Sequence, residues 1–101
     1  MNRGILTNEH LIKSGSHPSL GGEQRIYRFA NGYGLSVINS PMAHAYPFAW
    51  EIAVLKGVKK NGSFEGLTYE TPLTGDVEVF GSDEEANEFI KRAAGYFGPS
   101  R

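Results

Sequence analysis

The clearest hydrophobic pattern in the chain is a strict alternation over residues 48–55 (FAWEIAVL). Successive side chains of a strand point to opposite faces, so this alternation predicts a central strand whose bulky side chains all face the core. The bulky face consists of Phe48, Trp50, Ile52 and Val54, and the other face of Ala49, Glu51, Ala53 and Leu55.

A second pattern places two strand-like runs, residues 25–30 (RIYRFA) and 33–38 (YGLSVI), on either side of Asn31-Gly32. An Asn-Gly pair in this setting favours a hairpin with a type I′ turn, because both central residues of that turn need a positive φ. A two-residue turn fixes the register, so Phe29 is expected to face Gly34. A phosphate-binding glycine loop is disfavoured, because such a loop is followed by a helix and here another strand follows.

Residues 82–97 predict an amphipathic helix. Ser82-Asp-Glu-Glu85 fits a capping box, in which the Ser82 hydroxyl accepts from the Glu85 N–H and the Glu85 carboxylate reaches back. Gly98-Pro99 is expected to end the helix. The apolar positions form one stripe that must pack on a sheet; they are Ala86, Phe89, Ile90, Ala93, Ala94 and Phe97.

The remaining pattern is weaker. Two short strands are predicted over residues 67–71 and 76–80. Residues 1–23 form either an arm or a short helix plus loop, with Thr7 or Asn8 as the helix cap and Lys13 near its end. The fold class is therefore α+β, with an antiparallel sheet of about four strands and one C-terminal amphipathic helix packed on a face, in a single domain over residues 24–98. Its expected core is Ile26, Leu35, Val37, Trp50, Ile52, Val54, Phe89, Ile90 and Phe97.

Composition narrows the function classes. The chain has 101 residues and no cysteine, which excludes disulfides and thiolate metal sites. It contains no apolar stretch of the length of a membrane span or a signal peptide, so we expect a cytoplasmic protein without membrane contact. His10, His17 and His44 are too far apart in sequence for a metal motif, and the serines beside His17 lack an orienting group. We expect no metal, no cofactor and no enzymatic activity.

The charge distribution is uneven, because residues 61–90 contain many acidic residues but no Lys or Arg. Such a run is either a solvated surface or a docking surface for a basic partner. The loop over residues 39–47 adds large side chains of the kind that anchor interfaces. The residues predicted to bind a partner are Met42, Tyr46, Glu70, Asp76, Glu78, Asp83, Glu84, Glu85 and Glu88.

An alternative function is nucleic-acid binding. Basic residues interleaved with Tyr27 and Phe29 on a strand could bind phosphates while the rings stack on bases. The isoelectric point of about 6.3 speaks against this alternative, as does the interpretation that the two rings pack in the core. The basic residues concerned are Arg25, Arg28, Lys56, Lys59 and Lys60.

The segments YRFANGYGLSVI, WEIAVLKG and LTYETPLTGDV, followed by an acidic amphipathic helix, resemble a family of small orphan proteins of actinobacteriophages. The resemblance covers roughly residues 26–90, and the loop over 56–66 is longer than the family's usual one. The family has no established activity, so no catalytic residue is carried over. The resemblance implies an accessory phage protein in the host bacterial cytoplasm. By analogy with other small phage proteins, it would bind and block a host protein or ribonucleoprotein complex, such as a CRISPR–Cas defence system. A homodimer is left open.

Overall fold

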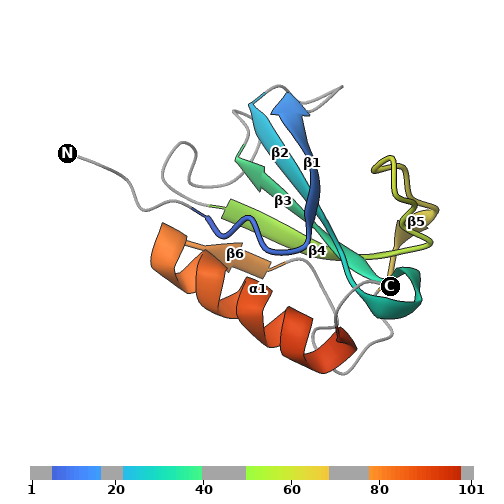
Figure 1. Ribbon diagram of the computed structural model, residues 1–101. Helices are drawn as coiled ribbons and strands as arrows, with labels where there is room; N and C mark the ends of the chain where they lie inside the picture. The colour runs from blue at the N-terminus through green and yellow to red at the C-terminus, as the bar shows by residue number, and fades with distance from the viewer. Residues whose placement is uncertain (1–5, 17–21, 40–49, 69–77, 99–101) are drawn as a thin grey trace.

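A computed structural model describes residues 6–16, 22–39, 50–68 and 78–98, and these residues form an antiparallel sheet with one helix across a face (Figure 1). The predicted α+β class is confirmed. The elements are β1 (Leu11–Ser16), β2 (Glu23–Arg28), a 3-10 turn (Ala30–Gly32), β3 (Gly34–Asn39), β4 (Trp50–Lys56), β5 (Gly66–Leu67), β6 (Glu78–Phe80) and α1 (Asp83–Phe97).

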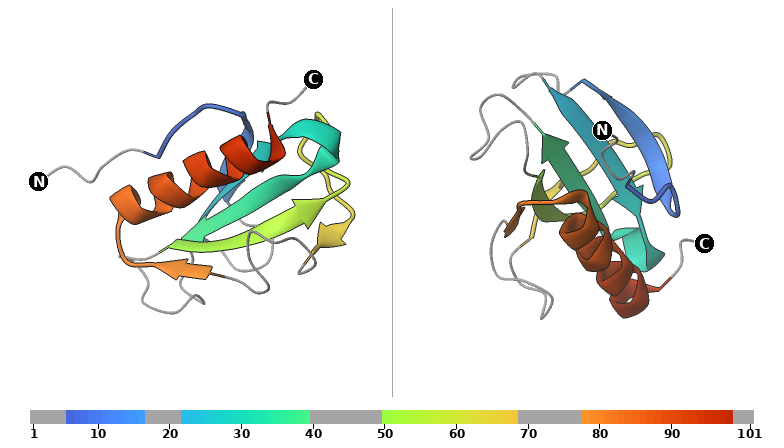
Figure 2. Two further views of the ribbon diagram at one scale, coloured as in Figure 1. Left: turned by 90° about the horizontal axis from the view of Figure 1, so that it is seen from below. Right: turned by 90° about the vertical axis from the view of Figure 1, so that its left-hand side faces the viewer.

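The described strands follow the order β1-β2-β3-β4, and two short strands then share the outer edge of β4. β5 pairs with the end of β4 at Leu55 and Lys56, whereas β6 pairs with its beginning at Trp50–Ile52. Helix α1 runs over a single face of this twisted sheet (Figure 2). The opposite face of the sheet therefore lacks a helical layer within the described residues.

The hairpin between β2 and β3 has the predicted turn but not the predicted register. Asn31 and Gly32 both have a positive φ, 63° and 79°, and Tyr33 N–H donates to the Ala30 carbonyl at 3.3 Å. However, Phe29 N–H, not Ala30 N–H, donates to the Tyr33 carbonyl at 2.7 Å. Two residues thus face Tyr33, which is a β-bulge.

At the bulge, the Ala30 N–H instead donates a 3.1 Å hydrogen bond to the carbonyl of Gly98, directly after α1. All pairs in the hairpin are therefore shifted by one residue: Tyr27 faces Leu35 and Arg28 faces Gly34. A shift of one residue moves a strand's side chains to the other face. Phe29 therefore does not face Gly34, and that prediction is wrong.

The register decides which side chains of β2 reach the helix. Tyr27 and Phe29 are fully buried in the main core, whereas Ile26 lies on the other face in a small cluster with Leu55 and Val58. Ile26 is buried in the core as predicted, at 1% exposure, but in the smaller cluster on the sheet face away from the helix. Phe97 is only partly buried at the edge of the main core.

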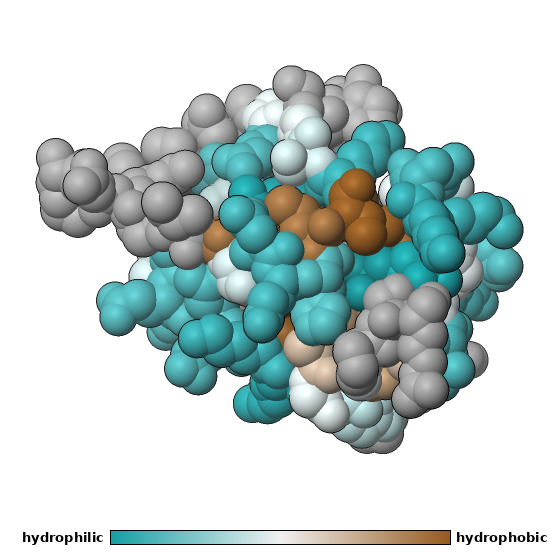
Figure 3. Space-filling view, viewed as in Figure 1, coloured by the Kyte–Doolittle hydropathy of each residue, from teal (hydrophilic) through white to brown (hydrophobic). Residues whose placement is uncertain are grey.

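Helix α1 begins as the sequence predicts. Ser82 Oγ accepts from the Glu85 N–H at 3.1 Å, and the Glu85 carboxylate accepts from Gly81 N–H at 3.2 Å, one residue earlier than in a standard capping box. Gly98 follows the last helical residue with φ 88°. Hydrophilic side chains cover the outer side of the first half of the helix (Figure 3).

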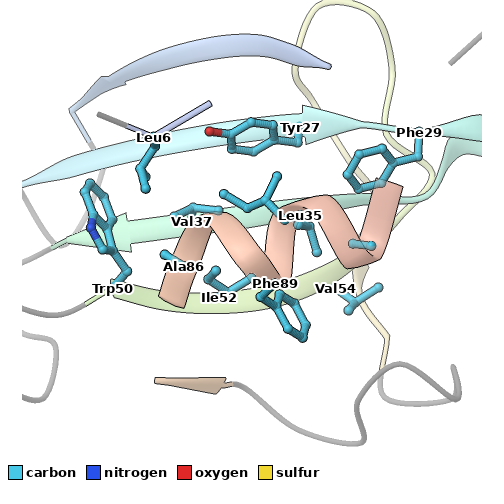
Figure 4. Packing of buried hydrophobic residues seen from close by; sticks show 12 residues of the cluster. Leu6, Tyr27, Phe29, Leu35, Val37, Trp50, Ile52, Val54, Ala86 and Phe89 are labelled. Carbon is cyan, nitrogen blue, oxygen red and sulfur yellow. The ribbon is translucent and has the colours of Figure 1, made fainter. Parts of the chain in front are cut away.

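The main core lies between α1 and the sheet, and its side chains point toward one another from both layers (Figure 4). Leu35, Val37, Trp50, Ile52, Val54, Phe89 and Ile90 are buried there, as predicted. Phe48, predicted to share this face of the strand, lies outside the described residues.

The N-terminal segment is part of this packing, and the predicted short helix is wrong. Residues 11–16 form the edge strand β1, which pairs with β2 through a bulge near Ile12. Ahead of that strand, Leu6 is buried in the main core at 4% exposure. Thr7 N–H donates to Asn87 Oδ1 of α1 at 2.8 Å, so the segment bridges sheet and helix.

Candidate protein-binding groove

A groove of about 550 Å³ lies between β6 and α1. The chain passes directly from β6 through Gly81 and Ser82 into the helix, so the two elements that border the groove are neighbours in sequence. The residues that line it are Glu78, Phe80, Glu85, Glu88, Phe89, Lys91 and Arg92.

The floor of the groove is aromatic. The rings of Phe80 and Phe89 lie 5.2 Å apart between centroids with their planes inclined by 39°. Phe89 is 5% exposed and belongs to the main core, whereas Phe80 is only partly buried against it. Tilted ring pairs of this kind are favourable, so packing within the core holds the two rings in place.

The rim of the groove carries opposite charges at its two ends. Glu85 and Glu88 lie toward the beginning of α1, and Lys91 and Arg92 lie farther along the helix. The Arg92 guanidinium sits 5.7 Å above the Phe89 ring. Among the described residues, the side chains of Glu88 and Lys91 make no hydrogen bond or ion pair, which leaves their charges available to a partner.

The structure gathers some of the predicted acidic residues and separates others. Glu78, Glu85 and Glu88 line the groove together, and Glu84 is exposed on the same helix without lining it. Asp83 has a structural contact, because its Oδ1 accepts a 2.5 Å hydrogen bond from the Trp50 indole N–H. The predicted binding residues Met42, Tyr46, Glu70 and Asp76 lie outside the described residues.

The two arginines of the nucleic-acid alternative lie on opposite faces of the sheet. Arg25 points to the helix face, where its guanidinium bonds Tyr27 Oη at 3.0 Å and Asn8 Oδ1 at 2.7 Å, and its side chain is 12% exposed. Arg28 lies on the opposite face, because three positions separate the two residues along one strand, and its Nε donates to the Val58 carbonyl at 2.9 Å.

The two aromatic rings that the nucleic-acid alternative requires are also absent from the surface. Tyr27 and Phe29 are 0% exposed, so neither ring can stack on a base. The interpretation that both rings pack in the core is confirmed. Lys56, Lys59 and Lys60 are exposed at the end of β4 and in the loop that follows.

Tyr27 connects the N-terminal segment to the sheet. Its hydroxyl donates to the Thr7 carbonyl at 2.7 Å. Burial raises the pKa of Tyr27 above the usual value of 10.0, although the hydrogen bond from Arg25 opposes that shift. The neutral phenol is therefore the form that the fold requires.

A second, smaller hollow of about 260 Å³ lies on the sheet face away from the helix, and it was not predicted from the sequence. Phe64 and Leu67 beside it are 38% and 42% exposed. Two of its polar side chains bond to each other, because Gln24 Nε2 donates to Ser36 Oγ at 3.2 Å. The hollow thus offers mainly apolar contact.

Histidines and acidic groups do not form a metal site in the part of the chain that the structure describes. The His10 ring packs edge-on against Phe29 with centroids 5.3 Å apart, and His17 and His44 lie outside the described residues. The described helix is too short and too polar to cross a membrane.

Sequence reasoning identified the acidic side of the groove but missed its aromatic floor. Phe89 was expected only as a core residue, and Phe80 only as the end of a short strand. One signal in the sequence could have indicated this floor. Only Gly81 separates Phe80 from the helix cap Ser82, so the strand and the helix must lie next to each other. No protein-family model, curated protein or solved structure matches this chain.

Proposed function

We propose that this chain is a non-enzymatic binding protein that captures and blocks a host macromolecule through the groove between β6 and α1. The observation that supports the proposal is the combination of a packed aromatic floor, Phe80 and Phe89, with the uncommitted carboxylate of Glu88 on the rim. Buried aromatic anchors supply most of the affinity of an interface, and rim charges supply orientation and association rate.

The proposal assigns no reaction to the chain. Within the described segments, the hydroxyls of Ser36, Ser63 and Ser82 bond to amide groups rather than to a base that could activate them. Together with the resemblance to phage orphan proteins, this favours an accessory phage or prophage protein that acts in the host bacterial cytoplasm. A host defence complex such as CRISPR–Cas is the proposed target.

The test is capture of a partner from host lysate by the immobilised chain, followed by mass spectrometry. A Glu84→Lys/Glu88→Lys variant reverses two exposed charges on α1, and a Glu9→Lys/Glu65→Lys variant reverses two exposed charges elsewhere. We expect the first variant to lose the captured partner and the second to keep it, with both melting temperatures close to that of the wild type. Equal capture by both variants would refute the role of this surface.

The same lysate experiment separates the proposal from nucleic-acid binding. Phosphate-driven binding weakens steeply with salt and survives removal of protein from the lysate. Capture that disappears after nuclease treatment of the lysate, and that depends on Lys59 and Lys60 rather than on Glu84 and Glu88, would support the nucleic-acid alternative instead.

A further inference from the structure

The loop between β4 and β5 contains an Asn-Gly pair, Asn61-Gly62, whose surroundings differ from those of Asn31-Gly32 in the hairpin (Figure 1). Asn61 is exposed, and its side-chain Oδ1 accepts two hydrogen bonds from Ser63. The Ser63 N–H donates at 2.9 Å and the Ser63 hydroxyl at 2.7 Å. Within the described segments, the side chain of Asn31 makes no hydrogen bond.

An Asn side chain followed by Gly can react with its own main chain. The Gly nitrogen attacks the side-chain Cγ, so that a new C–N bond forms and the proton of the Gly N–H passes to water. The side-chain nitrogen then takes up a proton and leaves as ammonia, and water opens the resulting succinimide ring at either carbonyl. The products are aspartate and isoaspartate. Gly favours the attack because it has no Cβ to hinder its nitrogen.

The two Ser63 donors point at the atom on which negative charge develops. In the tetrahedral intermediate that charge lies on Asn61 Oδ1, and donors roughly 2.7–3.1 Å from a developing oxyanion stabilise the transition state. Both Ser63 bonds have this length. The bond from the Ser63 N–H also closes a ring that contains both reacting atoms, Asn61 Cγ and Gly62 N. The side chain is therefore held beside the peptide group with which it must react.

Gly62 is required at its position by the packing of the loop. Its φ is 91°, and a Cβ would lie 2.6 Å from Lys13 Cδ, so another residue would be strained there. The Gly62 N–H donates to the Lys59 carbonyl at 2.9 Å and closes the turn. This bond must open before the nitrogen attacks, and a surface turn opens locally at a lower free-energy cost than the core strands do.

Asn31-Gly32 has the same residues without this arrangement. The φ of Asn31 is 63° and its ψ is 19°, which turns the Gly32 nitrogen toward the Asn31 main-chain nitrogen and away from the side chain. Two distant segments hold the turn, because Ala30 N–H donates to the Gly98 carbonyl and Val58 N–H donates to the Gly32 carbonyl. Ring closure at Asn31 therefore requires a rotation within a turn that is fixed from outside.

We propose that Asn61 is a site of spontaneous deamidation and that Ser63 accelerates the reaction through its two hydrogen bonds to Oδ1. Each event places a carboxylate beside Lys59 and Lys60 and adds one negative charge to this basic loop. The isoaspartate product also lengthens the main chain by one atom within the turn. The inference is independent of the proposed function.

The experiment follows both Asn-Gly pairs of the full chain by peptide mapping and mass spectrometry during incubation at mildly alkaline pH. It is run in buffer and in urea, because urea removes the fold and leaves the sequence unchanged. We expect Asn61 to react about tenfold or more faster than Asn31 in buffer, and the two rates to lie within about threefold in urea.

Substitution of Ser63 tests its part in the reaction. Ser63→Ala keeps the main-chain donor and removes the hydroxyl, so it should slow Asn61 about fivefold or more in buffer and change the rate little in urea. Ser63→Thr restores a hydroxyl and should recover most of the rate. The rate at Asn31 in the same samples is the internal control.

Three results would overturn the inference. Equal rates of the two pairs in buffer, or a faster reaction at Asn31, would refute the assignment of the site. Reaction of Asn61 in urea but not in buffer would show that the folded loop protects it. An unchanged or faster reaction of Asn61 in Ser63→Ala would refute the accelerating role of the Ser63 hydroxyl.

Discussion

The indole N–H of Trp50 donates to Oδ1 of Asp83, so that the first residue of β4 is joined to the first residue of α1. Trp50 is 3% exposed, and the bond therefore lies at the border of the core. This contact ties the beginning of the helix to the sheet. It also removes one of the acidic side chains of the 61–90 region from the set available to a partner.

The Trp50–Asp83 bond is expected to stabilise the fold measurably. Asp83→Ala leaves a buried indole N–H without its acceptor, which costs about 1–3 kcal/mol. Asp83→Asn keeps an acceptor oxygen and should recover most of that loss. Urea unfolding of both variants gives the comparison, and a cycle with Trp50→Phe isolates the pair. Equal stability of Asp83→Ala and wild type would contradict the assigned contact.

Gly34 is expected to tolerate no side chain. A Cβ at this position would lie 2.1 Å from the Tyr27 carbonyl oxygen and 2.9 Å from Val58 Cγ2, so the backbone of β2 would have to move. Overpacking of this kind costs about 1–3 kcal/mol or more.

Gly34→Ala should therefore lower the free energy of unfolding by at least that amount. Gly15→Ala is the matched control, because nothing lies within 4 Å of the added Cβ and its effect should stay within about 0.5 kcal/mol. Similar stabilities of the two variants in urea would show that the Tyr27 carbonyl does not approach Gly34 so closely.

Leu6 is expected to contribute to the core, although the sequence gives its segment little pattern. Burial at 4% exposure predicts that Leu6→Ala lowers the free energy of unfolding by about 2–5 kcal/mol. Glu9→Ala, at an exposed position of the same segment, should change it by less than about 0.5 kcal/mol. A negligible effect of Leu6→Ala in urea unfolding would mean that the N-terminal segment is not packed on the sheet.

Tyr27 is expected to make the fold sensitive to alkaline pH. Its pKa is raised in the folded state, so the folded state holds the phenolic proton more tightly than the unfolded state does. Below about pH 10, which is the pKa of a tyrosine in the unfolded chain, Tyr27 should not change the free energy of unfolding with pH. It should fall as the pH rises from there through the higher folded pKa.

Tyr27→Phe removes that titrating group and should flatten the decline in unfolding free energy above about pH 10. The same variant loses the hydrogen bond to the Thr7 carbonyl, so its stability at pH 7 should be lower by about 1 kcal/mol. An identical alkaline decline in the variant and the wild type would show that other groups cause it.

The sequence predicted elements whose signal is local. The cap at Ser82, the apolar stripe of α1 and the alternation over residues 50–55 each depend on neighbours within one element, and all three are present. The positive φ values at Asn31 and Gly32 were predictable for the same reason.

Predictions failed where a distant residue decides the local structure. The register of the hairpin depends on the Ala30–Gly98 hydrogen bond, and β1 depends on pairing with β2, since its own sequence (LIKSGS) has little strand character. Only part of the candidate groove could be predicted. The acidic residues of its rim are evident from the acidic run over residues 61–90, whereas its aromatic floor exists only once β6 and α1 pack together.

The contact between Ala30 and Gly98 has a consequence for the order of folding. The hairpin is local and closes early, whereas the end of α1 reaches it only after the whole helix has docked, with Phe97 stacked 4.8 Å from Tyr33. Before that step, the turn is free to adopt the two-residue register that its own sequence favours. We therefore expect Phe97 and Gly98 to favour the observed register, and removal of both residues to let the hairpin return to the two-residue register, which turns the other face of β2 toward the core.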